Sequence, residues 1–475
     1  MIANIDINPD PNAIPIWPLR GSELTAWQAD QTGIMSAWCR SSGFTAAAGK
    51  FILLPAETGG LAGVLLGLGA AAEQPGDYWA FGTLANSLPP GRYRIEGDLQ
   101  GLQAYHATLA WALAGYRFTR YRGTEDADEA VACLCLAGGV DGAALKATVK
   151  GSFLARDLIN TPASDMGPAE LADAALALAA EYGGTGTVIV GDDLLTANYP
   201  AIHAVGRAST RAPRLIDLRW GATDAPRLTL VGKGVCFDTG GLDLKAAAGM
   251  LKMKKDMGGA ATVLGLAAMV MAAELPVHLR VLIPAVENAV AGNAYRPGDV
   301  LQTRKGLTVE IGNTDAEGRI VLCDALAEAD AETPDLIIDI ATLTGAARVA
   351  LGPDLPAFFT GNDRVAAALL QAGQDQDDPS WRLPLFAPYA ERLKSNVADY
   401  NNVSEGPFAG AITAALFMQA FVSDPDRWLH IDSYGWNDKD RPGRPAGGEG
   451  LAMRALFAML VERFGPGSSW IGIDT

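Results

Sequence analysis

Residues 228–241 read LTLVGKGVCFDTGG, and this stretch indicates both the fold and the place to look for chemistry. A short apolar run is followed by a glycine-rich segment that carries Lys233 and Asp238. The run predicts a buried strand, and the glycines allow the backbone to approach a ligand closely. In open α/β sheets, ligands bind beyond the carboxyl ends of the strands. Lys233 and Asp238 are therefore candidate functional residues.

Apolar segments alternate with helical patterns through the rest of the chain. We expect strands over residues 187–190, 214–218, 228–231, 279–284, 335–340 and 428–432. We expect helices over residues 168–181, 258–273, 319–332 and 409–422. This alternation predicts an α/β fold with a mostly parallel central sheet that helices cover on both faces.

The first third of the chain has a different composition, rich in Gly, Pro and Trp. Strands are expected over residues 61–66 and 130–136, with helices over residues 102–114 and 143–158. An acidic, polar stretch covers residues 123–129. The last of these helices ends before Pro162, which cannot continue it. We therefore expect a smaller N-terminal α/β domain over residues 1–150 and a larger C-terminal α/β domain over residues 151–475.

Composition excludes several classes of protein. Of 475 residues, 49% are hydrophobic and 19% are charged, which is typical of a globular chain. Lys plus Arg number 37 and Asp plus Glu 54, so the net charge is −17. Such a surface repels nucleic acid and anionic membranes. Residues 258–273 are too short and small-sided for a membrane span, and the N-terminal residues lack a secretory pattern. We therefore expect a cytoplasmic protein without membrane or nucleic-acid partners.

Common catalytic and metal-binding motifs are absent from the sequence. It has no G-x-S-x-G, no P-loop and no H-E-x-x-H, and neither its four histidines nor its five cysteines have zinc-site spacing. Residues 67–72, GLGAAA, match a dinucleotide fingerprint weakly. We interpret them as a strand-to-helix turn, and a nucleotide-binding enzyme stays as an alternative that nucleotide titration would test.

The densest polar cluster is residues 313–319, NTDAEGR. In an extended segment, Asp315, Glu317 and Arg319 project to one side. Two adjacent carboxylates repel each other and favour a divalent cation between them, although an ion-pair network is an alternative. Thr314 and Glu317 also fit a capping box before the expected helix at residues 319–332.

Residues 252–259, KMKKDMGG, place Asp256 at the start of the expected small-residue helix. Asp256 is therefore either a functional carboxylate or a helix cap. Lys252, Lys254 and Lys255 are interpreted as a solvated charged face.

These segments together resemble the leucyl aminopeptidase family, also called cytosol aminopeptidases, which are two-metal peptidases. Residues 313–319 resemble the family signature. Residues 231–241 and 252–259 resemble its two metal-binding loops, and residues 341–346, ATLTGA, resemble its substrate-binding strand end. The intervals between the segments also fit, and the resemblance extends from about residue 151 to the C-terminus.

The resemblance implies a site with two divalent ions per subunit, zinc or manganese, that Asp238 and Glu317 bridge. The implied metal ligands are Lys233, Asp238, Asp256, Asp315 and Glu317. The implied catalytic residues are Lys245, which stabilises the oxyanion, and Arg319, which holds a bicarbonate ion that relays a proton. The implied substrate-binding residues are Met253, Thr342, Leu343 and Gly345.

The implied activity is release of N-terminal amino acids from peptides, with leucine or other apolar residues favoured. The resemblance also implies a homohexamer, a dimer of trimers, with residues 1–150 non-catalytic and related to assembly. Residues 432–437 differ from better-known members and border the pocket for the N-terminal side chain, so the preferred side chain stays open. A regulatory or DNA-binding protein on the same fold, with little peptidase activity, is the alternative, and the net charge of −17 argues against it.

Overall fold

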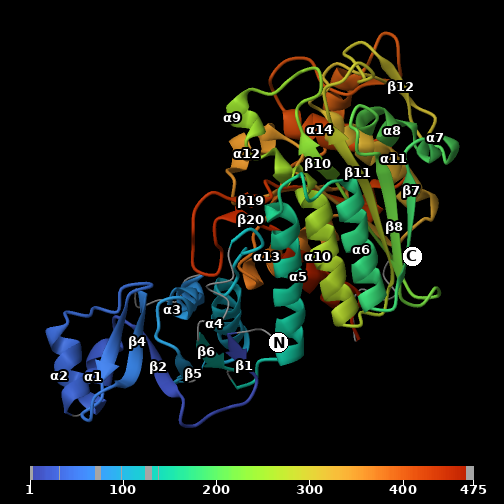
Figure 1. Cartoon of the computed structure of the whole chain (residues 1–475). Coiled ribbons are helices and arrows are strands. Elements are labelled where there is room, and N and C mark those ends of the chain that lie inside the picture. Colours follow the sequence, from blue (N-terminus) through green and yellow to red (C-terminus); the bar gives the residue numbers. More distant parts are fainter. Residues whose placement is uncertain are drawn as a thin grey trace. The chain divides into compact units, whose positions relative to one another are not determined.

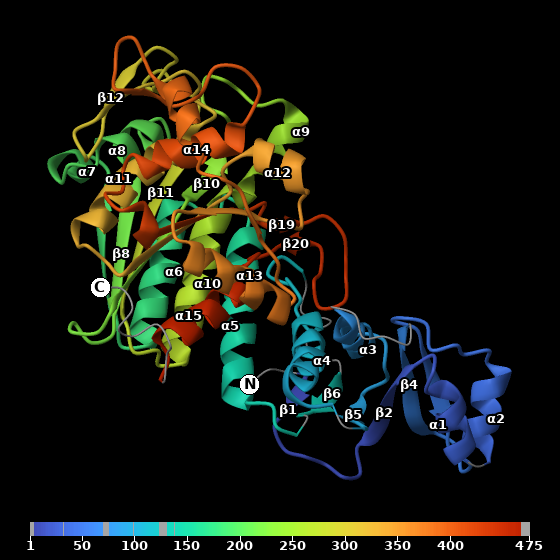
Figure 2. The same cartoon turned by 180° about the vertical axis from the view of Figure 1, so that it is seen from behind.

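A computed structural model of the chain divides into two compact units, which Figures 1 and 2 show from opposite sides. Unit 1 comprises Met1–Val149 and Asp438–Ala446, and unit 2 comprises Lys150–Asn437 and Gly447–Thr475. The structure describes residues 4–31, 33–69, 76–97, 99–122, 131–136 and 138–466.

Unit 1 contains, within its described residues, a six-stranded sheet in the order β1-β6-β5-β2-β4-β3. All neighbouring strands are parallel except β3, which is antiparallel to β4. The strands are β1 (Ile5–Asp6), β2 (Ile14–Arg20), β3 (Phe51–Pro55), β4 (Leu61–Gly69), β5 (Gly91–Ile95) and β6 (Ala132–Cys135). The helices are α1 (Leu24–Asp30), α2 (Ile34–Ser41), η1 (Asp77–Ala80), α3 (Phe81–Ala85) and α4 (Gly101–Ala114), and α5 (Gly142–Asn160) continues into unit 2.

Unit 2 is built on a nine-stranded sheet in the order β16-β15-β18-β14-β9-β11-β8-β7, with β10 paired to β11. The centre is parallel, whereas β8 is antiparallel to β11 and β7, and β15 is antiparallel to β18. Its strands are β7 (Thr185–Val190), β8 (Arg214–Trp220), β9 (Arg227–Gly232), β10 (Gly234–Asp238), β11 (His278–Asn288), β14 (Leu336–Ala341), β15 (Ala357–Thr360), β16 (Trp381–Arg382) and β18 (Trp428–Asp432). Shorter pairings involve β12 (Val300–Gln302), β13 (Thr308–Glu310), β17 (Tyr400–Asn401), β19 (Trp436–Asn437) and β20 (Gly447–Gly448).

Helices cover both faces of this sheet, because its central strands alternate apolar side chains between two cores. On β14, Ile338 belongs to one core and Ile337 to the other. One face carries α5, α6 (Pro168–Glu181), α10 (Gly258–Ala272), α13 (Asp363–Asp375) and α15 (Met453–Phe464), of which α5, α6 and α10 stand side by side in Figure 1. The other carries α8 (Pro200–Gly206), α11 (Glu317–Ala331) and α14 (Gly410–Gln419). The remaining helices are α7 (Asp193–Thr196), α9 (Ala247–Met250), η3 (Met253–Met257), α12 (Gly345–Leu351), η4 (Ala387–Leu393) and η5 (Pro425–Arg427).

Small residues let α10 lie close to both the sheet and α5. A Cβ at Gly259 would lie 2.0 Å from the carbonyl oxygen of Ile340, and one at Gly265 would lie 2.6 Å from that of Gly151. The start of α10 is therefore held against the carboxyl ends of β9 and β14. This packing fixes η3, the turn before α10 that carries Asp256.

The fold class and the core elements predicted from the sequence are confirmed. All six strands expected over residues 187–432 are present as β7, β8, β9, β11, β14 and β18. The glycine-rich residues 234–238, expected as part of a loop, instead form β10 along β11. Residues 67–69 end β4, whereas residues 70–72 and the acidic stretch at 123–129 lie outside the described residues.

Across the described ranges, no helix is both long enough and apolar enough to cross a membrane. The apolar segment near residue 260 is α10, whose residues are buried up to Met271.

Candidate active site

A cavity of about 540 Å³ lies where β9, β10, β14 and β18 end. Lys233 follows β9, Asp238 ends β10, Thr342 follows β14 and Tyr434 lies just beyond β18, and all four line the cavity. The parallel centre of the sheet therefore brings together segments that are far apart in the sequence, at the edge where ligands bind in α/β folds.

Lys233 joins two buried carboxylates at one end of the cavity. Its Nζ lies 2.7 Å from Asp256 Oδ2 and 2.8 Å from Glu317 Oε1, and it donates to the carbonyl oxygen of Thr342 at 3.0 Å. Burial lowers the pKa of Lys233, but the carboxylates of Asp256 and Glu317 outweigh it and raise that pKa overall. A Cβ at residue 318 would lie 2.5 Å from Lys233 Cε, so Gly318 gives this side chain its room.

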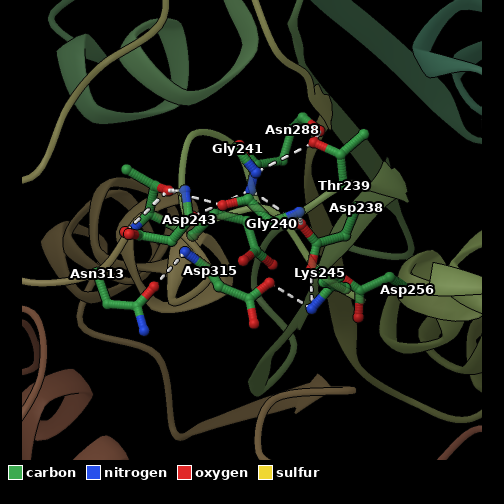
Figure 3. A network of polar contacts seen from close by, with 12 residues as sticks. Asp238, Thr239, Gly240, Gly241, Asp243, Lys245, Asp256, Asn288, Asn313 and Asp315 are labelled. Atoms are coloured by element: carbon green, nitrogen blue, oxygen red, sulfur yellow. Dashed lines mark hydrogen bonds and ion pairs between the residues drawn. The ribbon is translucent and has the colours of Figure 1, made fainter. Parts of the chain in front are cut away.

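Lys245 joins the other two carboxylates (Figure 3). Its Nζ lies 2.8 Å from Asp238 Oδ2 and contacts Asp315 Oδ1. Asp238 Oδ1 also accepts hydrogen bonds from the Gly240 backbone and from Asn288 Nδ2, each at 2.8 Å. These bonds fix the orientation of the Asp238 carboxylate.

Two loops, residues 240–243 and residues 313–315, lie together in Figure 3 and carry this part of the site. Asp243 Oδ2 accepts a hydrogen bond from the Thr314 backbone at 2.8 Å, and the Thr314 hydroxyl donates to the carbonyl oxygen of Gly240 at 2.6 Å. Gly240 has φ +90°, and a Cβ there would lie 2.5 Å from the carbonyl oxygen of Asp243. The glycine therefore allows the turn that brings Lys245 back to Asp238.

We call Asp238, Asp256, Asp315 and Glu317, with Lys233 and Lys245 between them, the acidic wall. One carboxylate oxygen each from Asp238, Asp315 and Glu317 lie within 4.8 Å of one another. Among the described residues, Glu317 Oε2 is buried and has no hydrogen-bond partner. Burial and the neighbouring Asp238 raise the pKa values of Glu317 and Asp315. Four carboxylates facing two ammonium groups leave this wall with surplus negative charge.

Asp432 holds the segment that follows β14. Its Oδ1 accepts from the backbone N–H groups of Leu343 and Thr344 at 3.1 Å, and its Oδ2 accepts from the Thr344 hydroxyl at 2.6 Å. The Thr342 hydroxyl donates to Asp256 Oδ1 at 2.7 Å. The segment after β14 and the acidic wall are thus joined by a direct hydrogen bond, from Thr342 to Asp256.

The cytosol aminopeptidase family's catalytic domain matches residues 153–457, and the N-terminal domain of M17 aminopeptidases matches residues 14–135. The chain belongs to the cytosol aminopeptidase family. A probable cytosol aminopeptidase of Roseiflexus castenholzii is 44% identical over 365 residues, which is 74% of this chain and 74% of that protein. The family resemblance found in the sequence is therefore confirmed, and with it a peptide-hydrolysing class of enzyme.

Solved structures of similar proteins agree with this membership. The cytosol aminopeptidase from Coxiella burnetii is 51% identical, with a TM-score of 0.91 over 96% of this chain and 98% of that one. The bottromycin maturation enzyme BotP, solved in complex with Mn, is 33% identical, with a TM-score of 0.83 over 94% of this chain and 98% of that one.

The cavity brings together nearly every site residue that the family resemblance had implied. It is lined by Lys233, Asp238, Lys245, Met253, Asp256, Asp315, Glu317, Thr342, Leu343 and Gly345. Arg319 is not among the lining residues. It is buried on α11 and donates to the carbonyl oxygen of Asn402 at 2.7 Å, and burial lowers its pKa to about 10.

Two local interpretations of residues 313–319 are wrong. Glu317 is the first residue of α11, so this segment is not extended and residues 315, 317 and 319 do not share one face. The helix has Ala316 at its N-cap with no side-chain cap bond, and the Thr314 hydroxyl binds Gly240 instead of forming a capping box. The helix starts at Glu317 instead of the expected Arg319, and the preceding Thr314 is bound to Gly240 and Asp243.

Two interpretations of residues 252–259 are also wrong. Asp256 does not cap α10, because Met257 is the N-cap and Asp256 points toward Thr342. The three lysines do not form a solvated face, since Lys252 and Lys254 are half-buried and Lys255 is buried. Burial lowers the pKa of Lys255 to about 8.

Sequence reasoning missed Asn288 and Lys255, and it named Asp432 and Tyr434 only as part of residues 432–437, the stretch expected to border the pocket. Asn288 ends β11 and Asp432 ends β18, so strand ends next to the predicted ones were the available signal. Lys255 gave no such signal, because its contact with Tyr434 joins η3 to the segment after β18.

Proposed function

We propose that the chain is a metal-dependent aminopeptidase that holds two divalent ions on the acidic wall. The carrying observation is the buried Glu317 Oε2, which has no hydrogen-bond partner in the described part of the chain. A buried carboxylate oxygen without a partner is unfavourable unless a cation compensates it, and Lys233 contacts only the other oxygen, Oε1. The residues that would hold the ions are Lys233, Asp238, Asp256, Asp315 and Glu317.

The donor set fits such ions. Carboxylate oxygens suit hard divalent ions, and an amine nitrogen suits zinc or manganese. Two divalent ions would offset the charges of the four carboxylates, and Lys233 would have to be neutral to donate its lone pair. BotP has been solved with Mn, and we propose zinc or manganese here. Bound in pairs, such ions lower the pKa of a water and so supply a nucleophile near neutral pH.

Lys245 is proposed to stabilise negative charge on the scissile carbonyl oxygen. Its ammonium group lines the cavity and lies between Asp238 and Asp315 (Figure 3). Those two carboxylates raise the pKa of Lys245 against the opposing effect of burial, so it stays charged. A fixed charge aimed at the developing oxyanion lowers the barrier to hydrolysis.

Arg319 is proposed to hold bicarbonate as the proton relay. Its Nη1 is engaged with Asn402, whereas its buried Nε has no hydrogen-bond partner among the described residues. That N–H group is a donor for an anion oxygen. A bicarbonate there would accept a proton from the attacking water, with Arg319 fixing its position.

The substrate side is proposed to accept an N-terminal residue with an apolar side chain, leucine among them. Met253, Thr342, Leu343 and Gly345 all line the cavity. Gly345 leaves room, because a Cβ there would meet nothing within 4 Å.

Assembly as a homohexamer, a dimer of trimers, in the cytoplasm is also proposed. Apolar side chains at Leu251, Val349, Val397 and Phe408 are exposed in unit 2, and burying such surface favours subunit association. Sedimentation of the purified chain tests the number of subunits.

Cleavage of matched peptides tests the proposed activity. Metal-free protein is given Leu-Gly-NH₂ or N-acetyl-Leu-Gly-NH₂, with and without added Mn²⁺ or Zn²⁺, and released leucine is measured. We expect release only from the free peptide and only with metal. Release without metal, or equal release from the acetylated peptide, would contradict the proposal.

A further inference from the structure

Lys255 is a buried lysine that lines the cavity outside the acidic wall. It lies on η3 between Lys254 and Asp256, and only 5% of its surface is exposed. It lines the cavity, and its Nζ lies 4.6 Å from the centre of the Tyr434 ring. The ring covers the ammonium group through a cation–π contact.

No carboxylate pairs with Lys255 within 4.0 Å anywhere in the described chain. The two nearby acids are committed elsewhere. Asp256 pairs with Lys233 and accepts from Thr342, and both oxygens of Asp432 accept hydrogen bonds from Leu343 and Thr344. Buried ammonium groups are rarely left without a partner, because desolvation of the charge is costly.

A second cation lies against the same ring. The guanidinium carbon of Arg348, on α12, is 5.0 Å from the centre of Tyr434, and the Arg348 side chain is exposed. It also forms no ion pair with the carboxylates that the structure describes. Two like charges around one ring repel each other, and a bound anion would relieve that repulsion. We call Lys255, Arg348 and Tyr434 the cationic wall.

We propose that the cationic wall is an anion subsite that takes the side-chain carboxylate of an N-terminal Glu or Asp. This rests on the proposed function, and it extends the released residues from apolar to acidic ones. Lys255 lies on η3 with Met253 and Asp256, and all three line the cavity, so its ammonium group lies beside the place proposed for the N-terminal residue of a peptide. Met253 and the Tyr434 ring pack on the methylene groups, and Lys255 and Arg348 donate to the carboxylate.

The C-terminal carboxylate of a dipeptide offers the same chemistry from the other end of the substrate. Amidated substrates remove that second source. The test therefore measures kcat/KM for Glu-Gly-NH₂, Gln-Gly-NH₂ and Leu-Gly-NH₂, with Leu-Gly as a further arm, on Mn²⁺-loaded protein.

The variant Lys255→Met removes the donor and keeps an apolar side chain of similar length. We expect the ratio of kcat/KM for Glu-Gly-NH₂ over Leu-Gly-NH₂ to fall by about 30-fold, the loss of one charge-assisted hydrogen bond. Gln-Gly-NH₂ should lose less, because its side chain is neutral. The matched control is Lys254→Met, whose ammonium donates to the carbonyl oxygen of Asn160 outside the cavity lining. Its ratio should stay within about twofold of wild type.

The outcomes separate this inference from the proposed function. Cleavage of Leu-Gly-NH₂ but not Glu-Gly-NH₂ by the wild type, or a ratio unchanged in Lys255→Met, would overturn the subsite and leave the aminopeptidase intact. Lys255→Met could instead lower kcat/KM only for Leu-Gly, which has a free C-terminal carboxylate. That result would assign Lys255 to the other end of the peptide and overturn the inference. Cleavage of no substrate would overturn the proposed function and the subsite with it.

Discussion

The two walls of the cavity each contain a buried lysine, and the two lysines differ in their partners. Lys233 is 3% exposed and lies between Asp256 and Glu317, whose charges raise its pKa. Lys255 is 5% exposed and has no carboxylate within ion-pair distance among the described residues, and burial lowers its pKa to about 8. Burial alone therefore does not set the pKa of a lysine, because the charges of its neighbours also raise or lower that pKa.

The difference extends to what each wall binds. The acidic wall has more carboxylates than ammonium groups, so it favours cations. The cationic wall has two cations without a carboxylate, so it favours anions. In the proposed enzyme, the acidic wall would serve hydrolysis and the cationic wall would select the side chain. If the two walls act separately, variants of the acidic wall should change the rate of cleavage, and variants of the cationic wall should change the ratio between substrates.

The largest effect is expected for Glu317→Gln, which keeps the size of the side chain and removes its charge. Cleavage of Leu-Gly-NH₂ should fall by at least about 1,000-fold in kcat/KM, because the buried carboxylate proposed as a metal ligand is lost. The control is Glu310→Gln, on β13, whose carboxylate accepts from Ser395 outside the cavity lining. Activity within tenfold of wild type in Glu317→Gln would show that the acidic wall is not the catalytic one.

A smaller effect is expected for Lys255→Glu, which reverses the charge of the cationic wall. Discrimination between Glu-Gly-NH₂ and Leu-Gly-NH₂ should shift by about 100-fold against the acidic peptide, because like charges repel at the subsite. Arg-Gly-NH₂ should become a better substrate relative to Leu-Gly-NH₂. Lys254→Glu is the control, and an equal shift in that variant would mean that the effect comes from the general field of the protein.

The smallest effect is expected for Asp432→Asn. An amide keeps one oxygen for the Leu343 and Thr344 backbone but cannot accept from the Thr344 hydroxyl. Loosening that loop should lower kcat/KM by about tenfold for acidic and apolar peptides alike, which fits a positioning residue. The ratio between the two substrates and the number of Mn²⁺ ions bound should not change. A changed ratio would mean that Asp432 contributes to the cationic wall directly.

The sequence predicted the sheet well because its strands are short, apolar and separated by strongly patterned helices. Helix α6 has the bounds expected, and β18 likewise. Strand β10 was not predicted, because Gly234 and the residues after it look like a loop until they pair with β11. Edge strands such as β15 and β16 depend in the same way on neighbours from elsewhere in the chain.

Most of the site was predictable because Lys233 and Asp238 lie at strand ends and the segments of the acidic wall have spacings shared with a known family. The cationic wall was not predictable, since the contact between Lys255 and Tyr434 joins two segments that are far apart in the sequence. A run of lysines in sequence is usually solvated, and nothing local distinguishes the one that a distant aromatic ring covers. Similarly, the sequence predicted extended geometry at Glu317 instead of a helix start. The loop before α11 is held by Gly240 and Asp243, which are distant from it in the sequence.

A calorimetric titration of metal-free protein with Mn²⁺ tests most directly whether the acidic wall holds two divalent ions. We expect two Mn²⁺ ions per chain in the wild type and in Lys255→Met, and at most one in Glu317→Gln. Failure of the wild type to bind Mn²⁺, or the same number of ions in Glu317→Gln, would contradict the account.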